Sequence, residues 1–173
     1  MQIADESTVN SNGSAYNGEE MGGKIWLDWP EELRCHDAAA LAEKKEQLQT
    51  AVKLQYFLQY QFTRQWKALR GYANRKGIRV IGDVPIYVPL DCADVWAEPE
   101  MFQLDKKRRP EVVAGCPPDA FTADGQLWGN PIYDWDAMEK TGFEWWIRRL
   151  EAAGRLYDVV RLDHFRGLES YWA

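Results

Sequence analysis

Hydrophobic residues recur at helical spacing between Asp37 and Lys76. A stripe with spacings of three and four residues, typical of one face of an α-helix, is formed by Leu54, Leu58, Phe62, Trp66, Leu69 and Ala73. Asp37 is suited to cap the start of this segment, and Gly77 is suited to end it. Forty residues exceed the usual length of one helix, so the pattern predicts two helices with a break near residues 46–50.

Two short runs of β-branched residues predict strands. The first, residues 78–84, is stopped by Pro85 and is typical of a buried strand. The second, residues 158–163, follows a helical pattern over about residues 141–156. In that helix, the residues predicted to share one face are Trp146, Leu150 and Ala153. Residues 89–135 are rich in Gly, Pro, Asp and aromatic residues, and we predict a long loop between the two strands.

The predicted order of elements is helix, strand, long loop, helix and strand. This alternation indicates an α/β fold with a parallel sheet that is covered on both faces. A loop of this length in such a fold is usually functional rather than a simple connection. Residues 1–23 hold four carboxylates, no Lys or Arg and many small polar residues, so we predict a flexible acidic lead.

The composition is that of an ordinary globular protein, with 46% hydrophobic residues among 173. An excess of 27 Asp and Glu over 21 Lys and Arg disfavours nucleic acids and anionic membrane surfaces as partners. The three cysteines lack the spacing of a metal site or a disulfide framework, and the chain has no Gly-rich phosphate loop. We therefore predict no cofactor and no metal. No apolar run approaches the length of a membrane helix, so no membrane partner is expected.

Charged residues stand at the end of the second predicted strand. Because side chains alternate along a strand, Arg161 and Asp163 point to one face, and Val160 and Leu162 point to the other. The carboxyl ends of strands form the rim where parallel α/β folds place their active sites. A plain ion pair that ends the strand explains the spacing equally well. The neighbouring His164 adds a titratable group, although a single histidine is more often structural.

The first strand and the long loop add further polar and aromatic candidates. Asp83 ends the first strand, and Gly82 beside it allows a backbone or a ligand to approach closely, although Asp83 could also simply turn the chain. Residues 117–121 and 125–131 mix aromatic rings and amides, a combination that favours sugar binding. Most tryptophans, such as Trp66 and Trp146 on helical stripes, are better explained as core residues.

The segment from Val159 to Gly167, with the sequence VVRLDHFRG, resembles a motif of the 4-alpha-glucanotransferase family, also called amylomaltase or disproportionating enzyme, of glycoside hydrolase family seventy-seven. Further matching motifs follow one another along the chain at residues 25–30, 82–88, 93–97, 125–131 and 171–172. The resemblance covers about residues 24–173. Several long motifs in the same order make a chance similarity untenable.

The resemblance implies a fold and an activity. The fold is α/β, part of an alpha-amylase-type (β/α)8 TIM barrel with long inserted loops that is incomplete in this chain. Residues 24–173 would form this partial catalytic domain, with a substrate-covering loop at about 115–135. The activity is transfer of α-1,4-glucan segments between malto-oligosaccharides or to glucose by a retaining mechanism, through a covalent glycosyl-enzyme. No cofactor is implied.

The resemblance also implies roles for particular residues. Asp163 would be the catalytic nucleophile, and Arg161 would orient it and favour its ionised form. The residues implied to bind substrate are Asp83, Asp119, Phe121, Trp128, Asn130 and His164. Ala120 stands where many bacterial relatives carry an aromatic residue. In having alanine there, the chain is similar to plant and algal plastid forms. The compartment would be the cytoplasm in a bacterium and the plastid in a plant or alga.

Members of the family supply the acid/base Glu and another essential Asp from strands that follow the nucleophile strand. The resemblance therefore implies that these groups lie outside the 173 residues, and we expect the isolated chain to be inactive. Two alternatives stay open. One is a retaining α-glucan hydrolase, which would form only shorter products from maltotriose. The other is a non-catalytic remnant that binds α-glucans.

Overall fold

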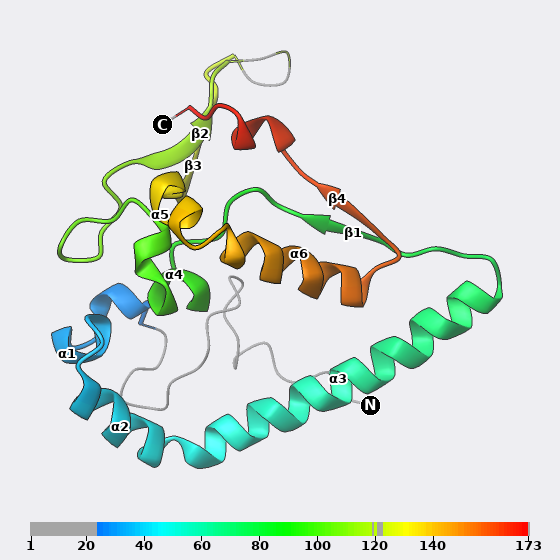
Figure 1. Ribbon diagram of the computed structural model, residues 1–173, viewed down its shortest axis with the longest axis horizontal. Helices are drawn as coiled ribbons and strands as arrows, with labels where there is room; N and C mark the ends of the chain where they lie inside the picture. Colours follow the sequence, from blue (N-terminus) through cyan, green and yellow to red (C-terminus); the bar gives the residue numbers. More distant parts are fainter. Residues whose placement is uncertain (1–23, 119, 121–122, 173) are drawn as a thin grey trace.

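The computed structural model describes residues 24–118, 120 and 123–172 (Figure 1). The acidic lead predicted for residues 1–23 lies outside the described residues. The helices are α1 (Glu31–Arg34), α2 (Ala38–Gln47), α3 (Gln49–Arg75), α4 (Ala93–Ala97), α5 (Trp135–Lys140) and α6 (Glu144–Leu156). The strands are β1 (Ile81–Val84), β2 (Val113–Cys116), β3 (Gln126–Pro131) and β4 (Val159–Leu162). Short 3-10 helices span Trp26–Asp28, Pro99–Met101 and Phe165–Leu168.

The predicted pair of helices is confirmed, including the break between them. The side chain of Asp37 accepts hydrogen bonds from the backbone N–H groups of Ala39 and Ala40, so it caps α2. The chain breaks at Leu48, and α3 then continues to Arg75. Gly77 follows with a φ of 78°, a left-handed conformation that glycine adopts without strain. Helix α3 runs along one side of the molecule as its longest element (Figure 1).

The two predicted strands form a parallel pair in the order β1–β4, with Ile81 opposite Val159 and Asp83 opposite Arg161. Two expectations are wrong. Strand β1 begins at Ile81 rather than Ile78, and only one of its faces is buried: Gly82 and Val84 are covered, whereas Ile81 is 67% exposed. Helix α6 contacts the covered side of both strands, and the opposite side is open to solvent in the described part of the chain.

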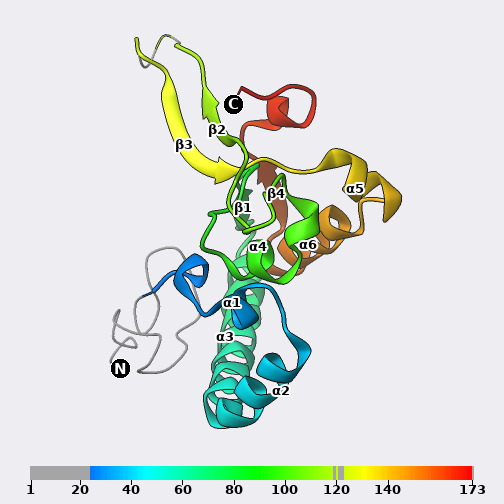
Figure 2. The same cartoon turned by 90° about the vertical axis from the view of Figure 1, so that its left-hand side faces the viewer.

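The segment predicted as one long loop contains regular structure. It holds α4, and then β2 and β3, which pair as an antiparallel hairpin that projects from the rest of the molecule (Figure 2). The C-terminal segment joins this hairpin, because the N–H of Gly115 donates to the carbonyl of Trp172. Short strands among many Gly and Pro residues give no clear alternation, which is why the pattern did not reveal them.

The core lies between the hairpin, α4, α5 and the start of α6. Its buried residues are Trp26, Ile86, Tyr87, Val88, Val95, Met101, Phe102, Ala114, Ile132, Tyr133, Met138, Trp145 and Trp146. On α6 the predicted common face is buried at Trp146 and Ala153, but Leu150 is 43% exposed. Trp66 on α3 is half-buried, and its indole N–H donates to the carbonyl of Leu156.

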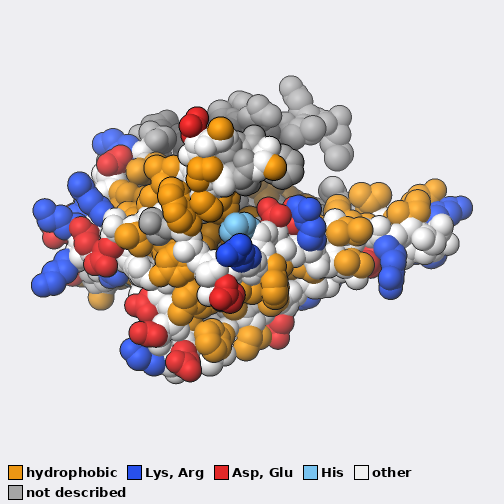
Figure 3. Space-filling model, turned by 90° about the horizontal axis from the view of Figure 1, so that it is seen from above, with side chains coloured by type: hydrophobic (Ala, Val, Ile, Leu, Met, Phe, Trp, Pro, Cys, Tyr) orange, Lys and Arg blue, Asp and Glu red, His pale blue; other side chains and the backbone are white. Residues whose placement is uncertain are grey.

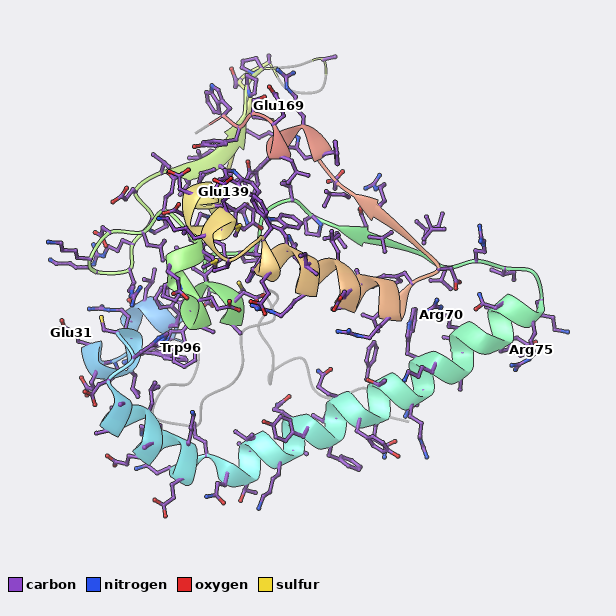
Figure 4. All side chains as sticks on the ribbon, in the orientation of Figure 1. Glu31, Arg70, Arg75, Trp96, Glu139 and Glu169 are labelled. Carbon is purple, nitrogen blue, oxygen red and sulfur yellow. The ribbon has the colours of Figure 1, made fainter. Side chains whose placement is uncertain are left out.

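Asp158 fastens α3 to the parallel strands. Its carboxylate accepts hydrogen bonds from the Val80 N–H and from the side chains of Arg70 and Asn74. Figure 4 shows Arg70 pointing from α3 toward the end of α6. The hydrogen bond from Val80, followed by those from Asn74 and Arg70, lowers the pKa of Asp158 to about 2. The start of both strands is thereby fixed, which sets where their carboxyl ends meet.

Candidate active site

Three charged side chains meet at the carboxyl end of the parallel strands. The guanidinium of Arg161 donates two hydrogen bonds to the carboxylate of Asp83, at 2.8 and 2.5 Å. The same guanidinium lies 3.5 Å from the carboxylate of Asp163. This placement follows from the parallel register, which sets Asp83 directly opposite Arg161, and from the alternation that turns Arg161 and Asp163 to the same face. The predicted proximity of Arg161 and Asp163 is confirmed.

The hydrogen-bonded pair of Asp83 and Arg161 favours the charged forms of both side chains. The hydrogen bond from Arg161 lowers the pKa of Asp83, and the same bond raises the pKa of Arg161. All three side chains are more than half exposed, so water and substrate hydroxyl groups can reach both carboxylates. Asp163 is held by its backbone, because its N–H donates to the carbonyl of Val84 at 2.9 Å.

His164 and Trp128 lie next to the charged cluster. The His164 backbone is left-handed, with a φ of 49°, and its ring meets the Trp128 ring edge to face at 5.0 Å. Trp128 comes from β3, is 36% exposed and also contacts the ring of Tyr87. Seen from above, hydrophobic side chains gather over the centre of the molecule, with charged side chains beside them (Figure 3). The two candidates are thus brought together from elements far apart in the sequence.

The other predicted site residues differ in what they can do. The side-chain amide of Asn130 donates to the carbonyl of Val88 at 2.9 Å, so this amide N–H ties the hairpin to the loop after β1. Asp119 and Phe121 lie outside the described residues. Gly82 does allow a close approach, but its neighbour is the ring of Tyr157 rather than a backbone or a ligand.

Sequence reasoning missed a second layer of residues behind the cluster. Arg149 on α6 and the buried Tyr133 both donate hydrogen bonds to the carbonyl of Ile86, three residues after Asp83. A signal for Arg149 was present, because Trp145 and Trp146 precede it by four and three residues, a spacing that places all three on one side of a helix, and an arginine beside buried rings needs internal acceptors.

The described residues hold no cluster of three or more His, Cys, Asp or Glu side chains that could bind a metal ion. None of the described helices is long and apolar enough to cross a membrane. What the cluster offers chemically is two solvent-accessible carboxylates around one guanidinium, with a tryptophan and a histidine ring alongside. Carboxylates can hold hydroxyl groups or attack an electrophilic carbon, and an aromatic ring can pack on a sugar face.

Comparison with known proteins finds relatives that are 4-alpha-glucanotransferases. The chain is 54% identical over 151 residues to a 4-alpha-glucanotransferase of Thermus thermophilus, and the matched region covers 87% of this chain and 30% of that protein. The chain is also 50% identical over 148 residues to the chloroplastic/amyloplastic 4-alpha-glucanotransferase of Solanum tuberosum, and this match covers 86% of the chain and 26% of that protein.

A solved structure agrees in fold. Amylomaltase from Streptococcus agalactiae, in complex with acarbose, superposes with a TM-score of 0.83 at 44% identity, over 88% of this chain and 31% of that chain. The chain thus spans about a third or less of the length of the relatives it matches. The family model described as 4-alpha-glucanotransferase matches residues 15–173. This chain therefore belongs to the 4-alpha-glucanotransferase family, glycoside hydrolase family 77.

Proposed function

We propose that this protein transfers α-1,4-glucan segments between malto-oligosaccharides or to glucose, by a retaining mechanism through a covalent glycosyl-enzyme. The observation that carries the proposal is the cluster at the carboxyl ends of β1 and β4, where Arg161 lies between the carboxylates of Asp83 and Asp163. The substrate class is supported by membership of the 4-alpha-glucanotransferase family and by the similar structure of the Streptococcus agalactiae amylomaltase, which was solved in complex with acarbose.

In this proposal Asp163 is the nucleophile. Its exposed carboxylate attacks the anomeric carbon and displaces the glycosidic oxygen of the departing glucan segment, and the nearby Arg161 guanidinium orients the carboxylate. Asp83 lies on the far side of Arg161 with free acceptor capacity toward solvent, which suits it to hold hydroxyl groups of the sugar at the cleaved bond. His164 and Trp128 line the same side. Retaining transfer also requires an acid/base carboxylate about 5–5.5 Å from the nucleophile.

We further propose that β1 and β4 are neighbouring strands of a (β/α)8 barrel. Their open face carries the apolar pair Ile81 and Val159 and, one layer higher, the charged pair Asp83 and Arg161. Barrel interiors are filled by layers of inward side chains, and active sites lie at the carboxyl ends of the strands. An apolar layer beneath a charged layer is the pattern expected for inward faces of such strands.

Transfer requires that a sugar hydroxyl group compete with water for the glycosyl-enzyme. The β2–β3 hairpin is suited to exclude water, because it brings Trp128 against His164 while Asn130 ties its base to Val88. The predicted loop at about 115–135 corresponds to this hairpin. Asp119 and Phe121, which stand between β2 and β3 in the sequence, remain proposed substrate contacts.

The test uses the full-length protein and maltotriose. Transfer predicts glucose together with oligosaccharides longer than maltotriose, whereas only shorter products would indicate a hydrolase. Asp163→Asn is expected to lower turnover by at least about 10⁴-fold, because a nucleophile cannot be replaced by its neutral isostere. Asp136→Asn, an exposed carboxylate on α5, serves as the matched control. Retained turnover in Asp163→Asn, with a native circular dichroism spectrum, would rule out the proposed nucleophile.

A further inference from the structure

The guanidinium of Arg149 is held at a fixed position behind the charged cluster. It lies over the rings of Trp145 and Trp146, with its central carbon 5.3 and 5.0 Å from the two ring centroids. It donates hydrogen bonds to the carbonyls of Pro85 at 2.7 Å and Ile86 at 3.1 Å. Two buried rings and two backbone acceptors leave this side chain little rotational freedom.

The carbonyls that Arg149 holds have left the sheet. Strand β1 ends at Val84, and Pro85 cannot donate a ladder hydrogen bond because it has no N–H. The chain then turns into the core, where Ile86 is 3% exposed, so its carbonyl needs an internal donor. Arg149 supplies one donor, and the hydroxyl of Tyr133 supplies another at 2.7 Å. The direction of the chain after β1 is therefore set by α6.

This anchored segment leads directly to both carboxylates. Asp83 is two residues before Pro85, so the path of the chain at Pro85 fixes the end of the strand that carries Asp83. Val84, which lies between them, accepts the backbone N–H of Asp163 at 2.9 Å. A shift of Pro85 would move the acceptor that holds Asp163 and the strand end that carries Asp83 at the same time.

We propose that Arg149 is a positioning residue that fixes the distance between the Asp83 and Asp163 carboxylates through the carbonyls of Pro85 and Ile86. The inference rests on the proposed glucan transfer for its catalytic consequence. The geometric part concerns the chain itself and can be measured without any turnover.

The neighbouring residue provides a matched control. Arg148 is on the same helix and of the same type, but its guanidinium pairs with Glu98 and Glu144 at the surface. In the full-length protein, Arg149→Met is expected to lower kcat for maltotriose disproportionation by about 100-fold, the cost of a misplacement near 1 Å, with KM changed less than about twofold. Arg148→Met is expected to keep both constants within about twofold of the wild type. Equal kcat values for the two variants, counted per folded molecule, would overturn the proposal.

Chemical rescue separates positioning from mere loss of stability. In Arg149→Ala the place of the guanidinium over the two tryptophan rings is vacant, and millimolar methylguanidinium is expected to raise kcat at least about tenfold. A destabilised protein would lose activity in the same solution. Failure of methylguanidinium to raise kcat in the folded variant would count against the proposal. If Arg149→Ala does not fold, Arg149→Lys keeps the charge but lacks the planar guanidinium whose two nitrogens reach Pro85 and Ile86. This variant is expected to lose kcat without a change in KM, and wild-type kcat in it would refute the role.

A second readout stands apart from the proposed function. If the wild-type protein forms no transfer products, the proposed function fails, and hydrogen exchange at the Asp163 amide still tests the geometry. Exchange is expected to be about tenfold faster in Arg149→Lys than in an Arg148→Lys control, because the Val84 acceptor is no longer held in place. Equal exchange rates in the two variants would overturn the positioning role.

Discussion

Gly82 offers a sharp test of how the two site-bearing strands are brought together. It lies on β1 immediately before Asp83, and the ring of Tyr157, two residues before β4, packs directly on it. A Cβ atom at this position would lie closer to three ring carbons of Tyr157 than the 3.0 Å that real Cβ atoms keep. We therefore expect Gly82→Ala to destabilise the folded protein.

The magnitude follows from the overlap and from what holds the ring. To restore ordinary contact the ring must retreat by roughly 1 Å or more, and it also meets Trp66 on α3 edge to face at 6.1 Å. Overpacking of this kind costs about 1–3 kcal/mol, and the severe overlap here points to the upper end. Alanine loses less backbone entropy than glycine on folding, which offsets about 0.5–1 kcal/mol of this cost. The net loss expected for Gly82→Ala is about 2 kcal/mol.

Gly154 on α6 supplies the control, because a Cβ atom there would meet nothing within 4 Å. Gly154→Ala is expected to stabilise the protein by about 0.5–1 kcal/mol through helix propensity. Urea denaturation of both variants, followed by tryptophan fluorescence, measures the difference. Tyr157→Leu should recover part of the loss in the double variant with Gly82→Ala, giving a coupling energy of about 1 kcal/mol. If Gly82→Ala proves as stable as Gly154→Ala, the close packing of Tyr157 does not set the approach of β1 and β4.

Three further outcomes are expected. Asp158→Asn should lower the free energy of unfolding above about pH 4, where the Asp158 carboxylate is charged in both the folded and the unfolded protein. The difference from the wild type should vanish as the pH falls through the folded-state pKa of about 2. Urea titrations measure this difference, and a difference that stays constant at all pH values would contradict the expectation. Trp26→Ala should lower the free energy of unfolding by about 3–5 kcal/mol, because Trp26 is 2% exposed and its indole N–H donates to the Leu90 carbonyl. Calorimetry measures this loss of stability, and a loss below about 1 kcal/mol would refute the reasoning. The isolated 173-residue chain should release no glucose from maltotriose, since it spans about a third or less of its relatives, and measurable release would overturn that expectation.

The helices and the parallel strand pair could be predicted because their signals are local. An apolar stripe, an aspartate cap and a glycine at φ 78° specify α2 and α3 wherever they pack. The grouping of Arg161 with Asp163 likewise followed from alternation along one strand. The bidentate contact between Arg161 and Asp83 did not follow, because it depends on the register of two strands separated by 74 residues, from Val84 to Val159.

The errors share a different physical cause. Ile81 was expected to be buried because it belongs to an apolar run, yet it is 67% exposed. Leu150 was predicted to share a helix face with Trp146 and Ala153, and it is 43% exposed where those two are buried. A periodic pattern gives the face of an element but not what covers that face. The hairpin was missed for the converse reason, since its strands owe their pairing to each other and to Trp172 rather than to their own propensity.

The open face of the parallel pair connects the errors to the function. Ile81 and Val159 lie side by side on it, directly beneath Asp83 and Arg161, and large apolar side chains on a strand normally lose most of their contact with water. Covering this face would desolvate the apolar pair and, above it, strengthen the attraction between Arg161 and its two carboxylates. The same covering would reduce the access of water to Asp163, the proposed nucleophile. The face that is exposed in the described part of the chain is therefore the one expected to turn inward in the proposed barrel.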